Sequence, residues 1–131
     1  MENLNGLRMR QIFSQDRKER RKSERVEARI PIACSLSKNN IVLNATTKDI
    51  SSGGVKLELS QPLEKGDRLK ILFRLPKTAK SISSMGKVVW YKRDPHQENV
   101  YEAGLKYARL KAKVKEILEK EVACWILAKQ T

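Results

Sequence analysis

The sequence has few of the residues that build catalytic, metal or disulfide sites. It holds one histidine and two cysteines in 131 residues, and aromatic residues make up only 5% of it. No cysteine and histidine cluster has the spacing of a metal site, and no Ser/His/Asp set or paired carboxylates indicate an enzyme. Cys34 and Cys124 lie far apart in apolar runs, which favours unpaired thiols in a reducing compartment. We therefore expect no metal, no cofactor and no catalysis.

Long apolar runs are absent too. No stretch approaches the roughly 18 to 20 residues that cross a bilayer, and residues 1–10 lack the apolar region of a secretory signal, so we expect a cytoplasmic protein. Acidic residues are scarce, with 15 against 28 Lys and Arg and a formal net charge of +13. This imbalance favours an anionic partner, which could be a nucleotide, a nucleic acid, an anionic membrane or an acidic protein. The sparse aromatics argue against a nucleic-acid platform.

The chain is long enough for one domain with a modest core. We place a flexible, basic N-terminal segment at residues 1–18 and the folded domain at residues 19–131. Residues 17–29 form a charge run rich in Arg and Lys. We expect this run to stay flexible until something anionic orders it.

Apolar residues recur with period two from Arg29 onward. Turn residues at 51–54, 64–67 and 94–96 interrupt the pattern, which is typical of antiparallel strands. Six strands with one apolar face each predict a closed or nearly closed barrel, because closure removes exposed edges. The six expected segments are Ile30–Leu36, Val42–Asp49, Val55–Leu59, Leu69–Leu75, Ile82–Tyr91 and Tyr101–Tyr107.

After Ala108 the period changes to 3.6 residues, which predicts an amphipathic helix near residues 111–128. We expect it to cover an end or flank of the barrel, with binding of a partner as the alternative. Trp90 is expected in the barrel core or at its rim rather than as a stacking platform, and His96 in a solvated loop. The apolar stripe of the helix consists of Val114, Ile117, Leu118, Glu121, Val122, Trp125 and Ile126.

Two short groups of residues could recognise a nucleotide. Arg21 and Arg25 are four residues apart, and guanidinium groups bind phosphate or the O6 and N7 acceptors of guanine. Asp49 could accept hydrogen bonds from guanine N1 and N2, which arginine cannot do. Ser51 could donate to a phosphate or cap its own turn, and Gly53–Gly54 allows positive φ and a close backbone approach. Each group alone is also an ordinary basic segment or turn.

Taken together and in this order, the two motifs resemble the signature of the PilZ domain family. The resemblance covers roughly residues 19–129. It includes Gly66, the Gly-x-Val-x-Trp run at residues 86–90 and the Gly-Leu-Lys-Tyr run at residues 104–107. It implies a mainly β fold, a six-stranded antiparallel PilZ-type barrel with a C-terminal amphipathic helix. It also implies that the ligand is cyclic di-GMP, a bacterial second messenger.

The resemblance also implies roles for individual residues. Arg21 and Arg25 would grip guanine and phosphate, Asp49 and Ser51 would hold the guanine edge and the turn, and Gly54 would keep the surface open to the base.

A basic residue immediately before the first motif arginine, here Arg20, goes with a stacked pair of ligand molecules in the family. Ordering of residues 1–25 would then signal to a downstream protein partner, which the sequence does not identify. Two alternatives stay open. One is a basic barrel that binds RNA or DNA, and the other is a PilZ-like module that acts only through protein contacts.

Overall fold

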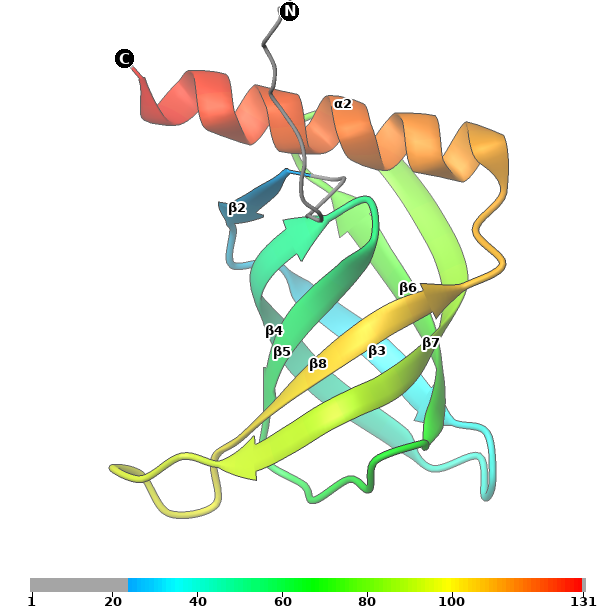
Figure 1. Ribbon diagram of the computed structural model, residues 1–131, viewed down its shortest axis with the longest axis vertical. Coiled ribbons are helices and arrows are strands. Elements are labelled where there is room, and N and C mark those ends of the chain that lie inside the picture. The colour runs from blue at the N-terminus through cyan, green and yellow to red at the C-terminus, as the bar shows by residue number, and fades with distance from the viewer. Residues whose placement is uncertain (1–23, 131) are drawn as a thin grey trace, which may run out of the picture.

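The computed structural model describes residues 24–130, which form seven strands and one helix (Figure 1). The mainly β fold with a C-terminal helix is confirmed. The elements are β2 (Arg25–Glu27), β3 (Pro31–Leu36), β4 (Val42–Ser51), β5 (Gly54–Leu59), β6 (Arg68–Leu75), β7 (Lys80–Arg93), β8 (Tyr101–Ala108) and α2 (Ala112–Lys129).

Six of the strands close into an antiparallel barrel, as the period-two pattern predicts. Around the ring, β3 pairs with β4, β4 with β5, β5 with β8, β8 with β7, β7 with β6, and β6 with β3. Because the ring is closed, each of the six strands pairs with a neighbour on both sides over at least part of its length. The short strand β2 adds to the end of β4, on the same side as β3.

Strand β2 corrects the expectation that the whole run 17–29 is flexible. Arg25 pairs with Ser51 and Glu27 with Asp49 across β2 and β4, while Val26 and Ala28 are buried in the core. The period-two pattern therefore begins at Val26 and not at Ile30. The charged residues between these apolar positions hid the alternation. Arg20, Arg21 and the rest of residues 1–23 lie outside the described residues.

The barrel interior is filled by the inward side chains of the six strands. In β6 the alternation is complete, because Leu69, Ile71 and Phe73 point inward and are almost fully buried. Burying one such side chain stabilises the fold by roughly 1.5 to 3 kcal/mol. Cys34 is part of this core and Cys124 lies half-buried on α2, and both thiols are free.

Two β-bulges interrupt the alternation on neighbouring parts of the wall. Lys48 is the extra residue in β4, between the pairs formed by Thr47 and Asp49 with β5. Val89 is the extra residue in β7, between the pairs formed by Val88 and Trp90 with β8. A bulge turns the residues that follow it to the opposite face of the sheet. Both bulges therefore re-aim the side chain immediately after them.

Helix α2 lies across one end of the barrel (Figure 1), near the predicted bounds of 111–128, and packs against β2 and β4. Its fully buried Glu121 side chain accepts hydrogen bonds from the β6–β7 turn. The donors are Lys77 N at 3.0 Å, Thr78 N at 2.8 Å and Thr78 Oγ1 at 2.9 Å. Trp125 Nε1, one turn further along the helix, donates to the same carboxylate at 2.8 Å. This carboxylate fastens the helix to the barrel.

Candidate ligand-binding site

The turn between β4 and β5 is held together by the hydroxyl of Ser51. Its Oγ accepts hydrogen bonds from Gly53 N and Gly54 N, each at 3.1 Å, and donates to Gly54 O at 3.1 Å. The residue is almost fully buried, and its single proton is already used. Of the two roles open to Ser51, the structure shows the turn cap.

Gly54 is needed for packing and not for an unusual backbone angle. A Cβ at this position would lie 2.3 Å from Leu105 O in the neighbouring strand β8, a distance that no side chain tolerates. Neither Gly53 nor Gly54 uses the positive φ that glycine allows. Among the glycines of the described chain, Gly66 is the one with φ in that region, at +95°. The motif glycine therefore lets β5 approach β8.

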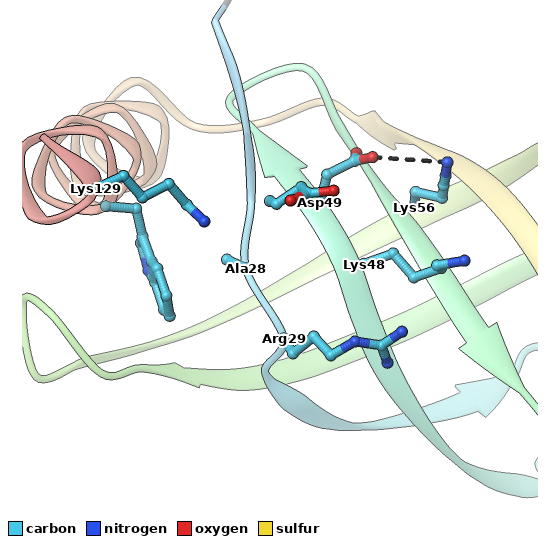
Figure 2. Close-up of a pocket in the computed structure, with 8 residues that line it drawn as sticks. Ala28, Arg29, Lys48, Asp49, Lys56 and Lys129 are labelled. Carbon is cyan, nitrogen blue, oxygen red and sulfur yellow. Dashed lines mark ion pairs between the residues drawn. The ribbon is translucent and has the colours of Figure 1, made fainter.

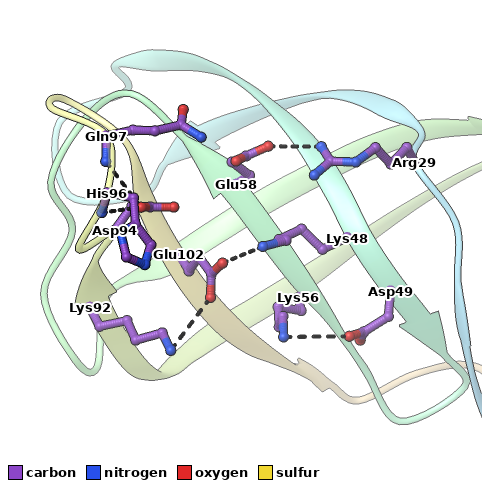
Figure 3. Close-up of polar contacts among 10 residues, drawn as sticks. All are labelled: Arg29, Lys48, Asp49, Lys56, Glu58, Lys92, Asp94, His96, Gln97 and Glu102. Atoms are coloured by element: carbon purple, nitrogen blue, oxygen red, sulfur yellow. Dashed lines mark hydrogen bonds and ion pairs between the residues drawn. The ribbon is translucent and has the colours of Figure 1, made fainter.

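Asp49 lies between two cations on the outer wall of the barrel. Its Oδ1 is 3.5 Å from Arg25 Nε, and its Oδ2 is 3.9 Å from Lys56 Nζ. Strict alternation after Thr47 would have pointed Asp49 into the core, and the bulge at Lys48 turns it outward instead. Figure 3 shows the contact with Lys56. The structure thus brings together one residue from each of the two motifs.

Trp90 contributes to the same surface, which the sequence did not predict. The residue is 38% exposed, and its side chain lies directly over Gly104. A Cβ on Gly104 would be only 2.1 Å from Trp90 Nε1. Counting in steps of two from Ile82 places Trp90 in the core, but the bulge at Val89 turns it outward. The Gly-Trp pairing across two strands was the signal that sequence reasoning missed.

These residues line one pocket of about 240 Å³ on the barrel wall. The lining combines residues of the β4–β5 turn with charged, aromatic and apolar residues of the neighbouring strands. Every motif residue within the described part of the chain takes part. The lining comprises Arg25, Asp49, Ser51, Gly53, Gly54, Val55, Lys56, Val89, Trp90, Gly104, Leu105 and Lys106.

A second pocket of about 370 Å³ adjoins the first. Asp49 and Lys56 line both pockets. Figure 2 shows Lys129 at the end of α2 on one side of this pocket and side chains of β4 and β5 on the other. Arg29 and Lys48 also line it. The cationic surface therefore extends from the first pocket toward α2.

Ion pairs hold the wall beside the two pockets (Figure 3). Lys48 Nζ donates to Glu102 Oε2, and Lys92 Nζ is 3.8 Å from the other oxygen of that carboxylate. Arg29 Nη1 donates to Glu58 Oε1 at 2.8 Å. The hydrogen bond from Lys48 lowers the pKa of Glu102, and the same bond raises the pKa of Lys48. These contacts order the strands that carry Asp49 and Lys56.

The remaining predicted features fall outside the site. His96 is exposed in the loop after β7, where Asp94 Oδ1 accepts hydrogen bonds from the backbone of His96 and Gln97 (Figure 3). Within residues 24–130, no three side chains of the metal-binding types cluster together. The one helix in that range is too polar to span a membrane.

The arrangement has counterparts among known proteins. The model of the PilZ domain family matches residues 19–123. The chain belongs to the PilZ domain family. No curated protein sequence matches it.

Solved structures share the fold of this PilZ domain at low sequence identity. The Bacillus subtilis inhibitor of motility, MotI/DgrA, superposes with a TM-score of 0.75 at 21% identity, over 86% of this chain and 54% of its own. The PilZ domain of YcgR from Escherichia coli, solved with c-di-GMP, has a TM-score of 0.69 at 17% identity, over 86% of this chain and 95% of its own. The K. pneumonia MrkH–c-di-GMP complex has a TM-score of 0.65 at 20% identity, over 86% and 55%. This chain therefore spans about half of MotI/DgrA and of MrkH.

Proposed function

We propose that this PilZ domain is a non-catalytic, cytoplasmic receptor for cyclic di-GMP. The observation that carries the proposal is the shared pocket, in which Arg25 of the first motif meets Asp49, Ser51 and Gly54 of the second. Two of the similar structures, YcgR and MrkH, are complexes with c-di-GMP. Family membership and pocket chemistry support the same ligand independently.

The pocket chemistry suits one end of the ligand. Asp49 accepts hydrogen bonds from guanine N1 and N2, and Arg25 binds phosphate or the guanine acceptors. The exposed face of Trp90 offers an apolar wall to a purine ring. At about 240 Å³ the pocket is smaller than the roughly 300 to 1,000 Å³ of typical small-molecule sites. It fits a base and its phosphate, and the rest of the ligand lies over the adjoining surface.

Ligand binding would exchange partners at Asp49. Arg25 is 53% exposed in its side chain while Asp49 is only 13% exposed, so the arginine can swing toward a phosphate more readily than the carboxylate can move. Arg21 and Arg20 of the preceding segment would complete the grip. Ordering that segment costs roughly 1 to 2 kcal/mol per residue, which charge-assisted hydrogen bonds of about 1.5 to 3 kcal/mol each can offset. The ordered segment would be the signal to a protein partner.

Calorimetry with cyclic di-GMP tests the receptor directly. Arg25→Ala should weaken binding by about 2 to 4 kcal/mol, because it removes a charge-assisted contact and leaves its ligand partner unpaired. The matched control is Lys113→Ala on the exposed side of α2, which should change the affinity little. Equal losses in the two variants would show that only net charge matters.

Specificity and stoichiometry refine the test. Asp49→Ala should weaken binding less than Arg25→Ala does. It should also reduce the preference for cyclic di-GMP over cyclic di-AMP, because adenine lacks the N1 and N2 donors whose hydrogen bonds Asp49 would accept. Arg20→Leu should move the calorimetric ratio from two ligands per chain toward one. A wild-type ratio of one would refute the role of Arg20 and leave the receptor intact.

A second function, binding of RNA or DNA, is favoured only by the net charge of +13. A nucleic-acid binder would lose affinity gradually with each basic residue removed and would show a steep salt dependence. If wild type binds no cyclic di-GMP, and binds RNA with an affinity that Arg25→Ala scarcely alters, the receptor proposal fails.

A further inference from the structure

Three basic residues lie in a row across the barrel wall. Arg68 of β6 is directly opposite Lys87 of β7, and Lys87 is directly opposite Lys106 of β8. All three side chains are exposed. No carboxylate of residues 24–130 lies within ion-pair distance of any of them. We call Arg68, Lys87 and Lys106 the basic row.

The basic row works against folding. Side chains directly opposite on neighbouring strands are in close contact, and like charges in such positions destabilise the sheet. Two of the three strands, β6 and β7, contain no Asp or Glu, and Glu102 of β8 pairs with Lys48 and Lys92 and not with the row. Such an arrangement is suited to an anionic group that neutralises the row from outside.

We propose that the basic row binds an acidic, extended segment of a partner protein. The barrel has six strands, so successive strands turn by roughly 60° around its axis, and three strands span about 120°. The three cations therefore fan outward over a curved wall. A flat membrane or a stiff DNA duplex can touch only part of such a wall, whereas a flexible chain can follow it from β6 to β8.

The chemistry of the row fits carboxylates. Arg68 presents a planar fork that binds a carboxylate with two parallel hydrogen bonds, and the two lysines add point charges. Neighbouring strands are about 4.8 Å apart, so the row extends roughly 10 Å across the three strands. An extended segment of about six residues is long enough to cover this distance. Lys106 also lines the ligand pocket, so one end of the segment would lie beside that pocket. The interaction goes beyond the proposed function and needs no bound nucleotide.

The test is fluorescence anisotropy with the ligand-free protein and a labelled peptide of alternating glutamate and serine, about ten residues long and thus roughly 33 Å when extended. The double variant Arg68→Gln, Lys87→Gln should weaken binding at least about tenfold, as expected for the loss of two charge-assisted contacts. The matched control, Lys111→Gln with Lys113→Gln, removes the same charge from the exposed start of α2 and should weaken it less than about twofold. Urea denaturation should show both double variants folded.

Three results would overturn the proposal. Equal losses in the two double variants would mean that the peptide senses only net charge. Tighter binding of a single-stranded DNA of matched charge, also lost in Arg68→Gln, Lys87→Gln, would assign the row to nucleic acid. Capture by phosphatidylserine vesicles that depends on the same two residues would assign it to a membrane surface.

Discussion

The two halves of the barrel wall carry charge in opposite ways. In the half made of β4, β5 and β8, each strand has one carboxylate, namely Asp49, Glu58 or Glu102, and each has a cation at ion-pair distance. The half made of β3, β6 and β7 contains no Asp or Glu. Within the described residues, the cations of β6 have no ion-pair partner.

This difference shows that net charge says little about how charge is used. In the first half, ion pairs of Lys48 and Lys56 link strands around the candidate pocket, while Lys106 takes no part in them. In the second half, Lys92 of β7 pairs with Glu102 of β8, but within residues 24–130 the cations of β6 and Lys87 of β7 have no ion-pair partner and remain available to an anion from solution. The wall thus carries ion pairs on β4, β5 and β8 and mostly unpaired cations on β6 and β7.

Besides Glu102, which pairs with Lys92 of β7, a second carboxylate reaches this half from outside it. Glu121 of α2 accepts hydrogen bonds from the β6–β7 turn and is fully buried. Glu121→Ala should lower the free energy of unfolding by about 2 to 4 kcal/mol, because several partly buried donors lose their charged acceptor. Urea denaturation measures the loss. Glu121→Gln, which keeps one acceptor oxygen, should cost clearly less, and equal costs would show that the carboxylate does not fasten the turn.

Removing a carboxylate from the first half should make it resemble the second. Glu102→Gln leaves Lys48 and Lys92 without their shared partner. The free energy of unfolding should fall by about 1.5 to 3 kcal/mol, the usual contribution of a hydrogen bond to a charged group. Glu98→Gln, in the exposed loop before β8, is the control and should have little effect. Urea denaturation at neutral pH measures both variants. Equal losses of unfolding free energy in Glu102→Gln and Glu98→Gln would show that the ion pairs of Glu102 do not stabilise the wall.

The same carboxylate predicts a dependence on pH. The pKa of Glu102 lies below its ordinary value of 4.5 in the folded protein, so the folded state binds fewer protons there than the unfolded chain. Its stabilising contribution is therefore complete above pH 4.5 and is lost as the pH falls through the lowered pKa. The difference in unfolding free energy between wild type and Glu102→Gln should shrink on acidification. A difference that stays constant down to pH 3 would refute this assignment.

The smallest effect is expected in the second half, and it has the opposite sign. Lys87→Glu places a carboxylate between Arg68 and Lys106. It should raise the free energy of unfolding by about 0.2 to 1 kcal/mol, because two repulsive pairs become attractive ones. The rise should fade in high salt, which screens exposed charges. Thermal denaturation at low and high salt measures the effect. A Lys87→Glu variant less stable than wild type at both salt concentrations would contradict the claim that the three cations repel one another.

The sequence by itself determined most of the architecture. The period-two pattern located six strands to within a few residues, and the change to period 3.6 located α2. These patterns suffice because strand and helix faces are set by local geometry and by the burial of apolar side chains. The spacing of Arg25, Asp49, Ser51 and Gly54 also predicted, through their resemblance to a family, four residues that line one pocket in the structure.

Only the tertiary structure decided which faces the site residues occupy and what lies beside them. Two single-residue bulges, at Lys48 and Val89, turned Asp49 and Trp90 from the core to the outer wall. Alternation alone cannot show a bulge, because its effect appears only when the partner strand fixes the register. The same holds for Lys87, which is one lysine among many in the sequence and becomes the centre of a row of like charges only when β6, β7 and β8 pair.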